Sequence, residues 1–239
     1  REAVLHKMSD ALLAMENAYQ RGITGEGVFS PTGLTGGNAV KMRKYRQAGK
    51  TLSGQMTLVG VEAALATNEV NAAMGVVCAT PTAGASGTLP GVLFAIHEQY
   101  KLSKEDKLNF LFVAALFGMV TANNAFISGA AGGCQAEVGS ASAMAAAAAV
   151  AIMGGSPAQS AHAFAMSLVC DPVAGLVEVP CVKRNTVGST NALICADMAL
   201  AGIENQIPAD EVIEAMYKVG RNMPRELRET GLGGLADTP

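Results

Sequence analysis

Apolar residues recur every three or four positions along most of this chain, which is the spacing of one buried face of an α-helix. Residues 1–20 show the pattern most clearly, and Gly22 and Gly25 predict the end of this first helix. Its apolar stripe consists of Val4, Leu5, Met8, Leu12, Met15 and Tyr19. No segment sustains the strict alternation of apolar and polar residues that a half-buried strand shows.

The same pattern, together with capping signals, predicts further helices along the chain. Ser103 followed by Asp106, and Ser156 followed by Gln159, form capping-box pairs that mark the starts of two helices. The expected helices cover residues 38–47, 57–74, 90–99, 104–121, 137–153, 157–169, 190–201 and 209–219.

Residues 173–182 form the only plausible strand, and Pro172 and Pro180 argue against it because proline cannot donate a hydrogen bond to a sheet. The chain has 239 residues, which is enough for one large domain with a sizeable core. We therefore predict an all-α fold, a single helical domain in which glycine-rich loops converge on one site.

The composition is rich in apolar residues and poor in charged ones. Hydrophobic residues make up 50% of the chain and charged residues 15%, and there is no Trp. This balance predicts large buried interfaces, so we expect a homo- or hetero-oligomer. The net charge of −3 and the lack of a long basic run argue against a nucleic-acid-binding protein.

The apolar content also raises the question of a membrane span. A transmembrane helix needs about 20 predominantly apolar residues, and the strongest apolar run, residues 110–120, is shorter. We therefore expect a buried helix and no membrane association. Residues 1–20 lack a secretory-signal pattern, and five irregularly spaced cysteines fit free thiols in a reducing cytoplasm. The first residue is Arg1 rather than Met, and the chain stops without a helix end, so we expect a fragment of a longer protein.

Three of the five cysteines lie between residues 128 and 185, a region almost free of charge. Cys134 follows a run of glycines and alanines, Cys170 precedes an Asp-Pro pair, and Cys181 follows a proline. Thiols at such predicted turns suggest a buried iron–sulfur cluster in which one iron is not held by cysteine and acts as a Lewis acid. The spacing matches no compact cluster motif, so spacing alone slightly favours ordinary buried cysteines. Cys78 and Cys195 lie in helical or apolar contexts and are interpreted as structural.

Two polar, glycine-rich loops, residues 30–38 and 80–88, each precede a predicted helix. Hydroxyl groups, bare glycine amides and a helix N-terminus together form an anion site, which predicts capture of an amino acid carboxylate. Simple capped loops are an equal alternative for either segment, but two such loops in one chain favour a convergent pocket. The candidate substrate-binding residues are Ser30, Thr32, Thr35, Gly36, Gly37, Asn38, Thr82 and Ser86.

No catalytic base stands out among the titratable residues. His162, eight residues before Cys170, is the only histidine expected near the site, and a satisfied core histidine is its more common role. The sequence shows no Ser-His-Asp order, zinc-type histidine spacing or pyridoxal-phosphate lysine motif. The catalytic residues therefore stay unassigned at this point.

Four long segments resemble one protein family. They are SPTGLTGGNAVKMRKY from Ser30, CATPTAGASGTLPG from Cys78, SGAAGGCQAEVGSASAMAAAA from Ser128 and CDPVAGLVEVPCVKRN from Cys170. In this order, and over essentially the whole chain, they look like the α-chain domain of the iron–sulfur-dependent L-serine dehydratases, also called L-serine ammonia-lyases. The resemblance implies a 4Fe–4S cluster held by Cys134, Cys170 and Cys181.

The resemblance also implies a reaction and a partner. L-serine would lose water by Lewis-acid β-elimination and yield pyruvate and ammonia, a step of amino-acid degradation and gluconeogenesis. Residues 1–239 match the α-type catalytic domain alone, so a β domain or β chain is expected to complete the enzyme. In some family members a cysteine of the C-terminal tail reaches the site, and this chain shows no such residue.

Alternatives to serine deamination remain open from the residues themselves. A related cluster-dependent lyase, such as an L-cysteine desulfidase, would need the same Lewis acid for a thiol leaving group. A non-catalytic structural subunit would use its cysteines only for packing and would bind no iron. A membrane permease is a third and weaker alternative.

Overall fold

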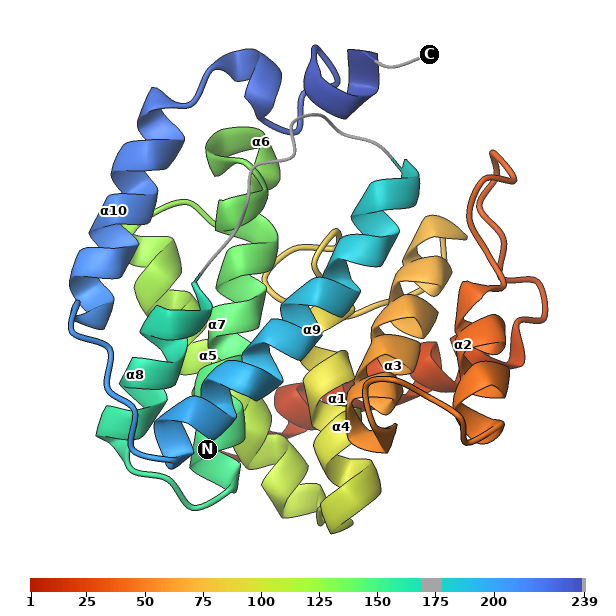
Figure 1. Ribbon diagram of the computed structural model, residues 1–239, viewed down its shortest axis with the longest axis horizontal. Coiled ribbons are helices and arrows are strands. Elements are labelled where there is room, and N and C mark those ends of the chain that lie inside the picture. Colours follow the sequence, from red (N-terminus) through yellow and green to blue (C-terminus); the bar gives the residue numbers. More distant parts are fainter. Residues whose placement is uncertain (169–177, 238–239) are drawn as a thin grey trace.

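The computed structural model describes residues 1–168 and 178–237, which form a bundle of α-helices (Figure 1). Within these two ranges there is no strand, so the predicted all-α, single-domain fold is confirmed. The helices are α1 (Glu2–Thr24), α2 (Asn38–Gln47), α3 (Gln55–Ala72), α4 (Thr88–Tyr100), α5 (Lys104–Asn124), α6 (Gly129–Gly132), α7 (Ser140–Ile152), α8 (Pro157–Ser167), α9 (Glu178–Leu200) and α10 (Ala209–Asn222).

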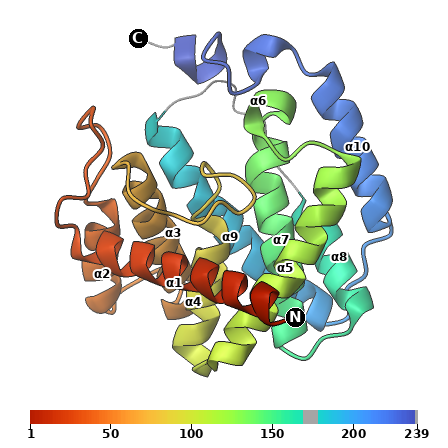
Figure 2. The same cartoon turned by 180° about the vertical axis from the view of Figure 1, so that it is seen from behind.

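The alanine-rich helix α7 lies at the centre of the bundle (Figures 1 and 2). It packs against α4, α5, α8 and α9, and every residue from Ser140 to Val150 is buried. Alanine is the best helix former and carries only a Cβ, so the neighbouring helices approach α7 closely. The buried hydroxyl of Ser142 is paired, because it donates to the carbonyl of Gly188 at 2.7 Å.

One helical segment among the described residues, Gln135–Ile152, has the length and apolar content of a membrane span. Since 83% of this segment is buried inside the bundle, it has the environment of a core helix. The expectation of a buried helix in this part of the chain agrees with that packing.

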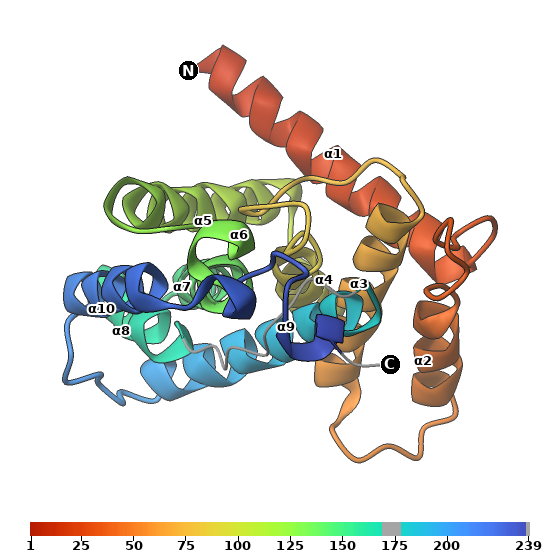
Figure 3. The same cartoon turned by 90° about the horizontal axis from the view of Figure 1, so that it is seen from above.

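Helix α1 crosses one side of the bundle (Figure 2), and its N-terminal half projects beyond the other helices (Figure 3). The predicted apolar stripe is therefore buried only in part: Leu12 and Met15 are in the core, whereas Val4 is 57% exposed. The prediction that Gly22 ends this helix is wrong, because Gly22 lies inside α1. A Cβ at this position would come within 2.3 Å of the carbonyl oxygen of Ala66, so the glycine permits close contact between α1 and α3. Gly25 caps the helix in the left-handed conformation, with φ of 73°.

Several helix boundaries follow the capping signals. Both capping boxes are present at the starts of α5 and α8, and α2 covers the predicted range. The helix predicted over residues 190–201 forms only the second half of α9, which begins at Glu178, so the first half was missed. Residues 178–182 of the unlikely strand are helical, and residues 173–177 lie outside the described part of the chain.

Candidate active site

A short π-helix, η1 (Gln135–Gly139), follows Cys134 directly and leads into α7. The wider turn of a π-helix interrupts the regular helical register, and such turns occur frequently at functional sites. Here the turn carries Glu137, whose side chain is buried with 8% exposure. The site is therefore organised around a carboxylate on a helical irregularity, three residues after the first predicted cluster cysteine.

The loop before α4 surrounds the Glu137 carboxylate. The hydroxyl of Thr82 donates a short hydrogen bond to Oε1 of Glu137. Gly84 lies so close that a Cβ there would be 2.7 Å from the same oxygen. Figure 2 shows this loop between α3 and α7, in front of α9 in that view. The predicted polar loop at residues 80–88 thus meets the start of α7.

Burial and, to a smaller extent, a hydrogen bond with the carboxyl group of Glu229 raise the pKa of Glu137 from its usual value of 4.5 to about 7. The Thr82 hydroxyl opposes this rise because it stabilises the carboxylate, and so does the positive charge of Arg184. A carboxyl group with a pKa near 7 can accept and return a proton at neutral pH, which is the property of a general acid–base group.

A second carboxylate, Glu229, connects Glu137 to the cysteine. The Cys134 thiol donates to Oε1 of Glu229 with an Sγ–O distance of 3.3 Å. The backbone amide of Glu229 donates to the carbonyl of Gly129 at 3.2 Å, and a Cβ on that glycine would lie 2.0 Å from Oε2 of Glu229. The glycine-rich turn therefore lets the segment that follows α10 lie against α6, as Figures 1 and 2 show.

The side chain of Asn185 on α9 fixes the other face of the loop and is fully buried. Its Oδ1 accepts from the Gly87 amide at 3.2 Å and from the Thr88 hydroxyl at 2.9 Å. Its Nδ2 donates to the carbonyl of Gly84 at 2.8 Å and reaches the carbonyl of Cys181 at 3.4 Å. One amide group thereby holds the loop against the first turns of α9, where the half-buried Cys181 lies.

The structure brings some of the predicted site residues together. Thr82 contacts the Glu137 carboxylate, and Cys134 contacts Glu229, the partner of Glu137. Cys181 lies one turn before Asn185, which holds the loop, and the Ser86 hydroxyl bonds to Asn68 of α3 at 3.2 Å. Cys170 lies outside the described residues. Within residues 1–168 and 178–237, no group of three His, Cys, Asp or Glu side chains could by itself hold a metal ion.

The other predicted loop, residues 30–38, is held mainly by hydrogen bonds among its own residues. The hydroxyls of Ser30 and Thr32 are 2.9 Å apart, and the Thr35 amide donates to Ser30. The amides of Asn38 and Ala39 at the start of α2 donate to the buried carboxylate of Glu69 at 2.7 and 3.2 Å. A carboxylate of the chain itself thus satisfies this helix N-terminus.

Gly36 and Gly37 of that loop have positive φ angles, which form the tight turn into α2. Figures 1 and 3 show the loop at the α2 edge of the molecule, whereas α6 and α7 lie on the other side of α3. The loop and Cys134 therefore border different parts of the fold, whereas the start of α9, with Cys181, lies near the end of the loop, because Asn38 and Lys183 line one pocket. The role of Ser30–Asn38 in substrate binding stays a prediction.

The other singled-out residues are structural. Nδ1 of His162 accepts from the backbone amide of Asn205 at 3.1 Å, so this histidine is satisfied within the fold. Cys195 is buried in the main hydrophobic core, and Cys78 is half-buried in the wall of an apolar cavity. Both positions agree with the structural interpretation from the sequence.

Sequence reasoning missed Glu137 and Glu229. Glu137 did carry a signal, since it is the first charged residue after Lys107 in a long uncharged stretch. A lone carboxylate in such a stretch is buried only when it is paired or functional. Glu229 carried no local signal, because its role depends on the C-terminal segment folding back over α6 (Figure 1).

Comparison with known proteins identifies the family. The sequence model of the family described as "Serine dehydratase alpha chain" matches residues 1–236. The chain belongs to this family.

Several relatives match most of this chain's length. The chain is 61% identical over 245 residues to the probable L-serine dehydratase, alpha chain, of Bacillus subtilis (strain 168), covering 100% of this chain and 81% of that protein. It is 65% identical over 188 residues to the protein of the same name from Latilactobacillus sakei, covering 76% and 90%. The L-serine dehydratase, alpha chain, of Peptoniphilus asaccharolyticus is 42% identical over 241 residues, covering 98% and 82%. The resemblance drawn from the four sequence segments is thus confirmed.

Proposed function

We propose that this chain is the catalytic alpha chain of an L-serine dehydratase, which converts L-serine to pyruvate and ammonia. The names of its relatives support the substrate and the reaction. The observation that carries the proposal is the buried Glu137 carboxyl group, whose raised pKa suits removal of the proton on the α-carbon of an amino acid.

The residues present fit an iron–sulfur cluster. Cys134 precedes the π-helix that carries Glu137, and Cys181 lies one helical turn before Asn185, which holds the loop around Glu137. Thiolates are the ligands that such clusters require. We propose that these two cysteines hold the cluster together with Cys170. When bound, the cluster supplies a Lewis acid that polarises the bond between the β-carbon and the hydroxyl group of serine.

The chain itself supplies the proton chemistry. Glu137 takes the α-proton of serine while the Thr82 hydroxyl and the charge of Arg184 stabilise its carboxylate. Glu229 shares a hydrogen bond with Glu137, so the pair can pass a proton to the departing hydroxyl group, which then leaves as water. The aminoacrylate product tautomerises to an imine, and water hydrolyses the imine to pyruvate and ammonia.

The loop around Glu137 also binds and positions the substrate in this proposal. Thr82 and Ser86 provide hydroxyl groups, and the bare backbone of Gly84 leaves space beside the carboxylate. The residues Ser30, Thr32, Thr35, Gly36, Gly37 and Asn38 remain predicted contacts to the substrate.

The alpha-chain names of the relatives imply a partner, so we propose that a beta chain or beta domain completes the enzyme in the cytoplasm. In this proposal the beta chain binds at the loop of residues 30–38, beside α2, and so completes the substrate-binding site. The amount of activity that the alpha chain shows alone is therefore part of the test.

The test is an anaerobic reconstitution with iron and sulfide, followed by iron analysis and a pyruvate assay with L-serine, with and without the beta chain. We expect about four irons per chain and pyruvate formation, both lost in Cys134→Ala. The matched control is Cys195→Ala, which removes a buried thiol of the core and should retain its iron. A well-folded protein that binds no iron would refute the cluster. Consumption of L-cysteine without consumption of L-serine would identify L-cysteine as the substrate in place of L-serine.

A further inference from the structure

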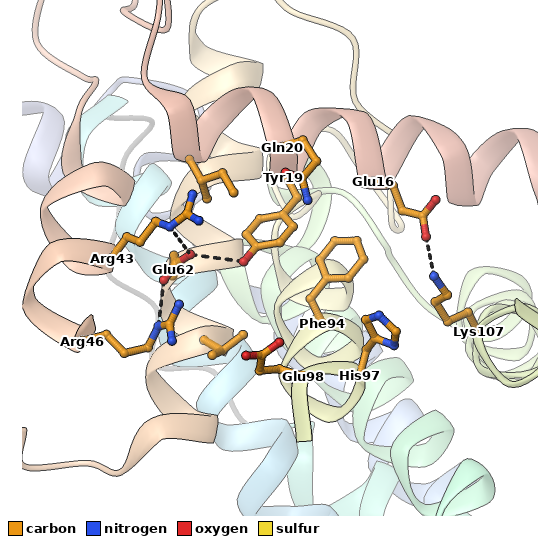
Figure 4. Close-up of a pocket in the computed structure, with 12 residues that line it drawn as sticks. Glu16, Tyr19, Gln20, Arg43, Arg46, Glu62, Phe94, His97, Glu98 and Lys107 are labelled. Carbon is orange, nitrogen blue, oxygen red and sulfur yellow. Dashed lines mark hydrogen bonds and ion pairs between the residues drawn. The ribbon is translucent and has the colours of Figure 1, made fainter. Parts of the chain in front are cut away.

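A polar cavity of about 480 Å³ lies between α1, α2, α3, α4 and α5 (Figure 4). Its volume is in the range of small-molecule binding sites. None of its lining residues belongs to the candidate active site, whose side chains come from α6, η1, α9, the loop before α4 and the C-terminal segment. The serine dehydratase reaction proposed above makes no use of this cavity.

One end of the cavity holds two arginines that face a single buried carboxylate. Glu62 is 0% exposed, and its carboxylate is 2.9 Å from Nε of Arg46 and 4.0 Å from Nε of Arg43. The Tyr19 hydroxyl also donates to Glu62, at 3.1 Å. Because one negative charge faces two positive charges, this end keeps a net positive charge.

The two guanidinium groups also retain hydrogen-bonding capacity. Arg43 and Arg46 approach Glu62 through Nε, and among the described residues their terminal nitrogens donate to no side chain or carbonyl. Terminal guanidinium nitrogens are the atoms that grip a carboxylate with two parallel hydrogen bonds. This end of the cavity is therefore suited to the carboxylate of a ligand.

The opposite end has the reverse character. Lys107 and Glu16 form an ion pair with an N–O distance of 2.5 Å, so these two charges offset each other. Glu98 has only a weak partner, because its contact with Lys101 at 3.4 Å joins two side chains that are each at least 60% exposed. Nδ1 of His97 is buried and has no hydrogen-bond partner in the described ranges. Figure 4 shows Glu98 between Arg46 and His97, so a carboxylate and an unsatisfied imidazole nitrogen lie next to each other on α4 beyond the arginines.

A short apolar wall separates the two ends. The rings of Tyr19 and Phe94 stack with a centroid distance of 4.8 Å, and Figure 4 shows them between the arginines on one side and His97 with Lys107 on the other. Burial and the nearby lysines Lys107 and Lys101 lower the pKa of His97, so its ring is neutral at pH 7 and has an acceptor nitrogen.

We propose that this cavity binds a small zwitterion whose carboxylate and ammonium groups are separated by a short aliphatic chain, that is, an ω-amino acid or a compound of that class. Arg43 and Arg46 hold the carboxylate, Glu98 and Nδ1 of His97 accept from the ammonium group, and the aliphatic part lies against Phe94. Glu62 offsets one arginine and Glu16 offsets Lys107. The remaining arginine and Glu98 then complement the carboxylate and the ammonium group of such a ligand.

The test is a calorimetric titration of the full chain with β-alanine, 4-aminobutyrate and 6-aminohexanoate, which carry the same two charges at increasing separation. Succinate and 1,4-diaminobutane serve as probes that carry only one type of charge. We expect at least one ω-amino acid to bind at one site per chain and more tightly than either control probe. Failure of all three, or equal binding of succinate, would overturn the proposal.

Substitutions of the lining residues test whether the ω-amino acid binds in this cavity. Arg43→Gln and Glu98→Gln change partly exposed side chains that the core does not depend on, and each should weaken binding by roughly tenfold, because a charged hydrogen bond is lost. Lys44→Gln removes the same charge as Arg43→Gln from the exposed side of α2 and should leave binding unchanged. Glu137→Gln should also leave it unchanged. Binding that is insensitive to both cavity variants, or lost in Glu137→Gln, would refute this site.

Discussion

The Thr82 hydroxyl donates a hydrogen bond to the carboxylate of Glu137, although the two residues are 55 positions apart in the chain. This contact joins the loop before α4 to the π-helix that precedes the central helix α7. Burial acts on Glu137 to favour its neutral form, and Thr82 acts to favour its charged form. The balance leaves a carboxyl group that titrates near neutral pH beside the predicted cluster cysteine, which is the chemical basis for the predictions on the reaction.

Replacing the carboxyl group at position 137 is expected to abolish most of the activity. Glu137→Gln keeps the size of the side chain and its ability to bond to Thr82, but it cannot accept a proton. General acid–base groups typically contribute about a hundredfold to ten-thousandfold to the rate, so kcat should fall by that factor while the iron content is unchanged. The measurement is pyruvate formation by the reconstituted enzyme. A variant with near-normal kcat would remove Glu137 from the mechanism.

The pH profile provides a second test of Glu137. Since the base must be deprotonated in the free enzyme, kcat/KM for L-serine should rise with pH and reach half of its plateau near pH 7, the pKa of this carboxyl group. The residual activity of Glu137→Gln should not show this step. A wild-type profile that is flat between about pH 6 and pH 8 would contradict the assignment.

The same raised pKa predicts how stability depends on pH. The folded protein holds the proton on Glu137 more tightly than the unfolded chain does, so between pH 4.5 and about 7 the folded state binds more protons. The free energy of unfolding therefore decreases across this range as the pH rises, and the contribution of this group levels off above it. Urea unfolding of the wild type and Glu137→Gln at several pH values measures the effect. The stability difference between them should shift in favour of the Gln variant as the pH rises.

Gly84→Ala should disturb the site more than the fold. A Cβ at this position would lie 2.7 Å from Oε1 of Glu137, so the carboxylate must move away from Thr82. A displacement of about 1 Å of a catalytic group can reduce activity about a hundredfold, whereas the stability should fall by only about 1 kcal/mol. Ala83→Ser adds an atom at the neighbouring exposed position and serves as the control. Equal activity of the two variants would argue against a positioned carboxylate.

Local signals in the sequence predicted those parts of the fold that depend on local interactions. The range of α2 and both capping boxes were correct because caps act within three or four residues. The start of α9 was missed because Pro180 was interpreted as a break, although proline is tolerated in the first turn of a helix. The anion at the start of α2 could not be foreseen, since Glu69 comes from α3, about thirty positions away.

In the candidate site, too, features set by local sequence were predicted, and features set by long-range contacts were not. The resemblance indicated the cysteines and the loop that carries Thr82, but it gave no base. The sequence marks Glu137 only as a lone charge in an uncharged stretch. Its acid–base role becomes recognisable when its partners at positions 82 and 229 are brought beside it, because its pKa depends on burial and on contacts between distant segments. Long-range packing, rather than any local pattern, thus defines the acid–base chemistry.

The fully buried Asn185 is expected to determine the stability of the loop around the site. Asn185→Ala leaves the Gly87 amide, the Thr88 hydroxyl and the Gly84 carbonyl without this partner. An unsatisfied buried group costs about 1–3 kcal/mol, so the free energy of unfolding should fall by at least that amount. Asn124→Ala, at an exposed position with one local bond, should change it by less than about 0.5 kcal/mol. Chemical denaturation of both variants measures the contrast, and equal losses would show that the Asn185 network contributes little.

Arg46→Ala tests the buried charge in the polar cavity between α1 and α5. It removes the closest partner of Glu62, and that carboxylate then stays in the fold at 0% exposure with Arg43 4.0 Å away and the Tyr19 hydroxyl. Breaking a buried ion pair from one side costs about 3–5 kcal/mol, so urea unfolding should show a loss in that range. Lys218→Ala breaks an exposed pair with Glu214 on α10 and should cost no more than about 1 kcal/mol. If Arg46→Ala is as mild as Lys218→Ala, water or the remaining arginine must solvate Glu62, and the arginine end would be more open than its burial indicates.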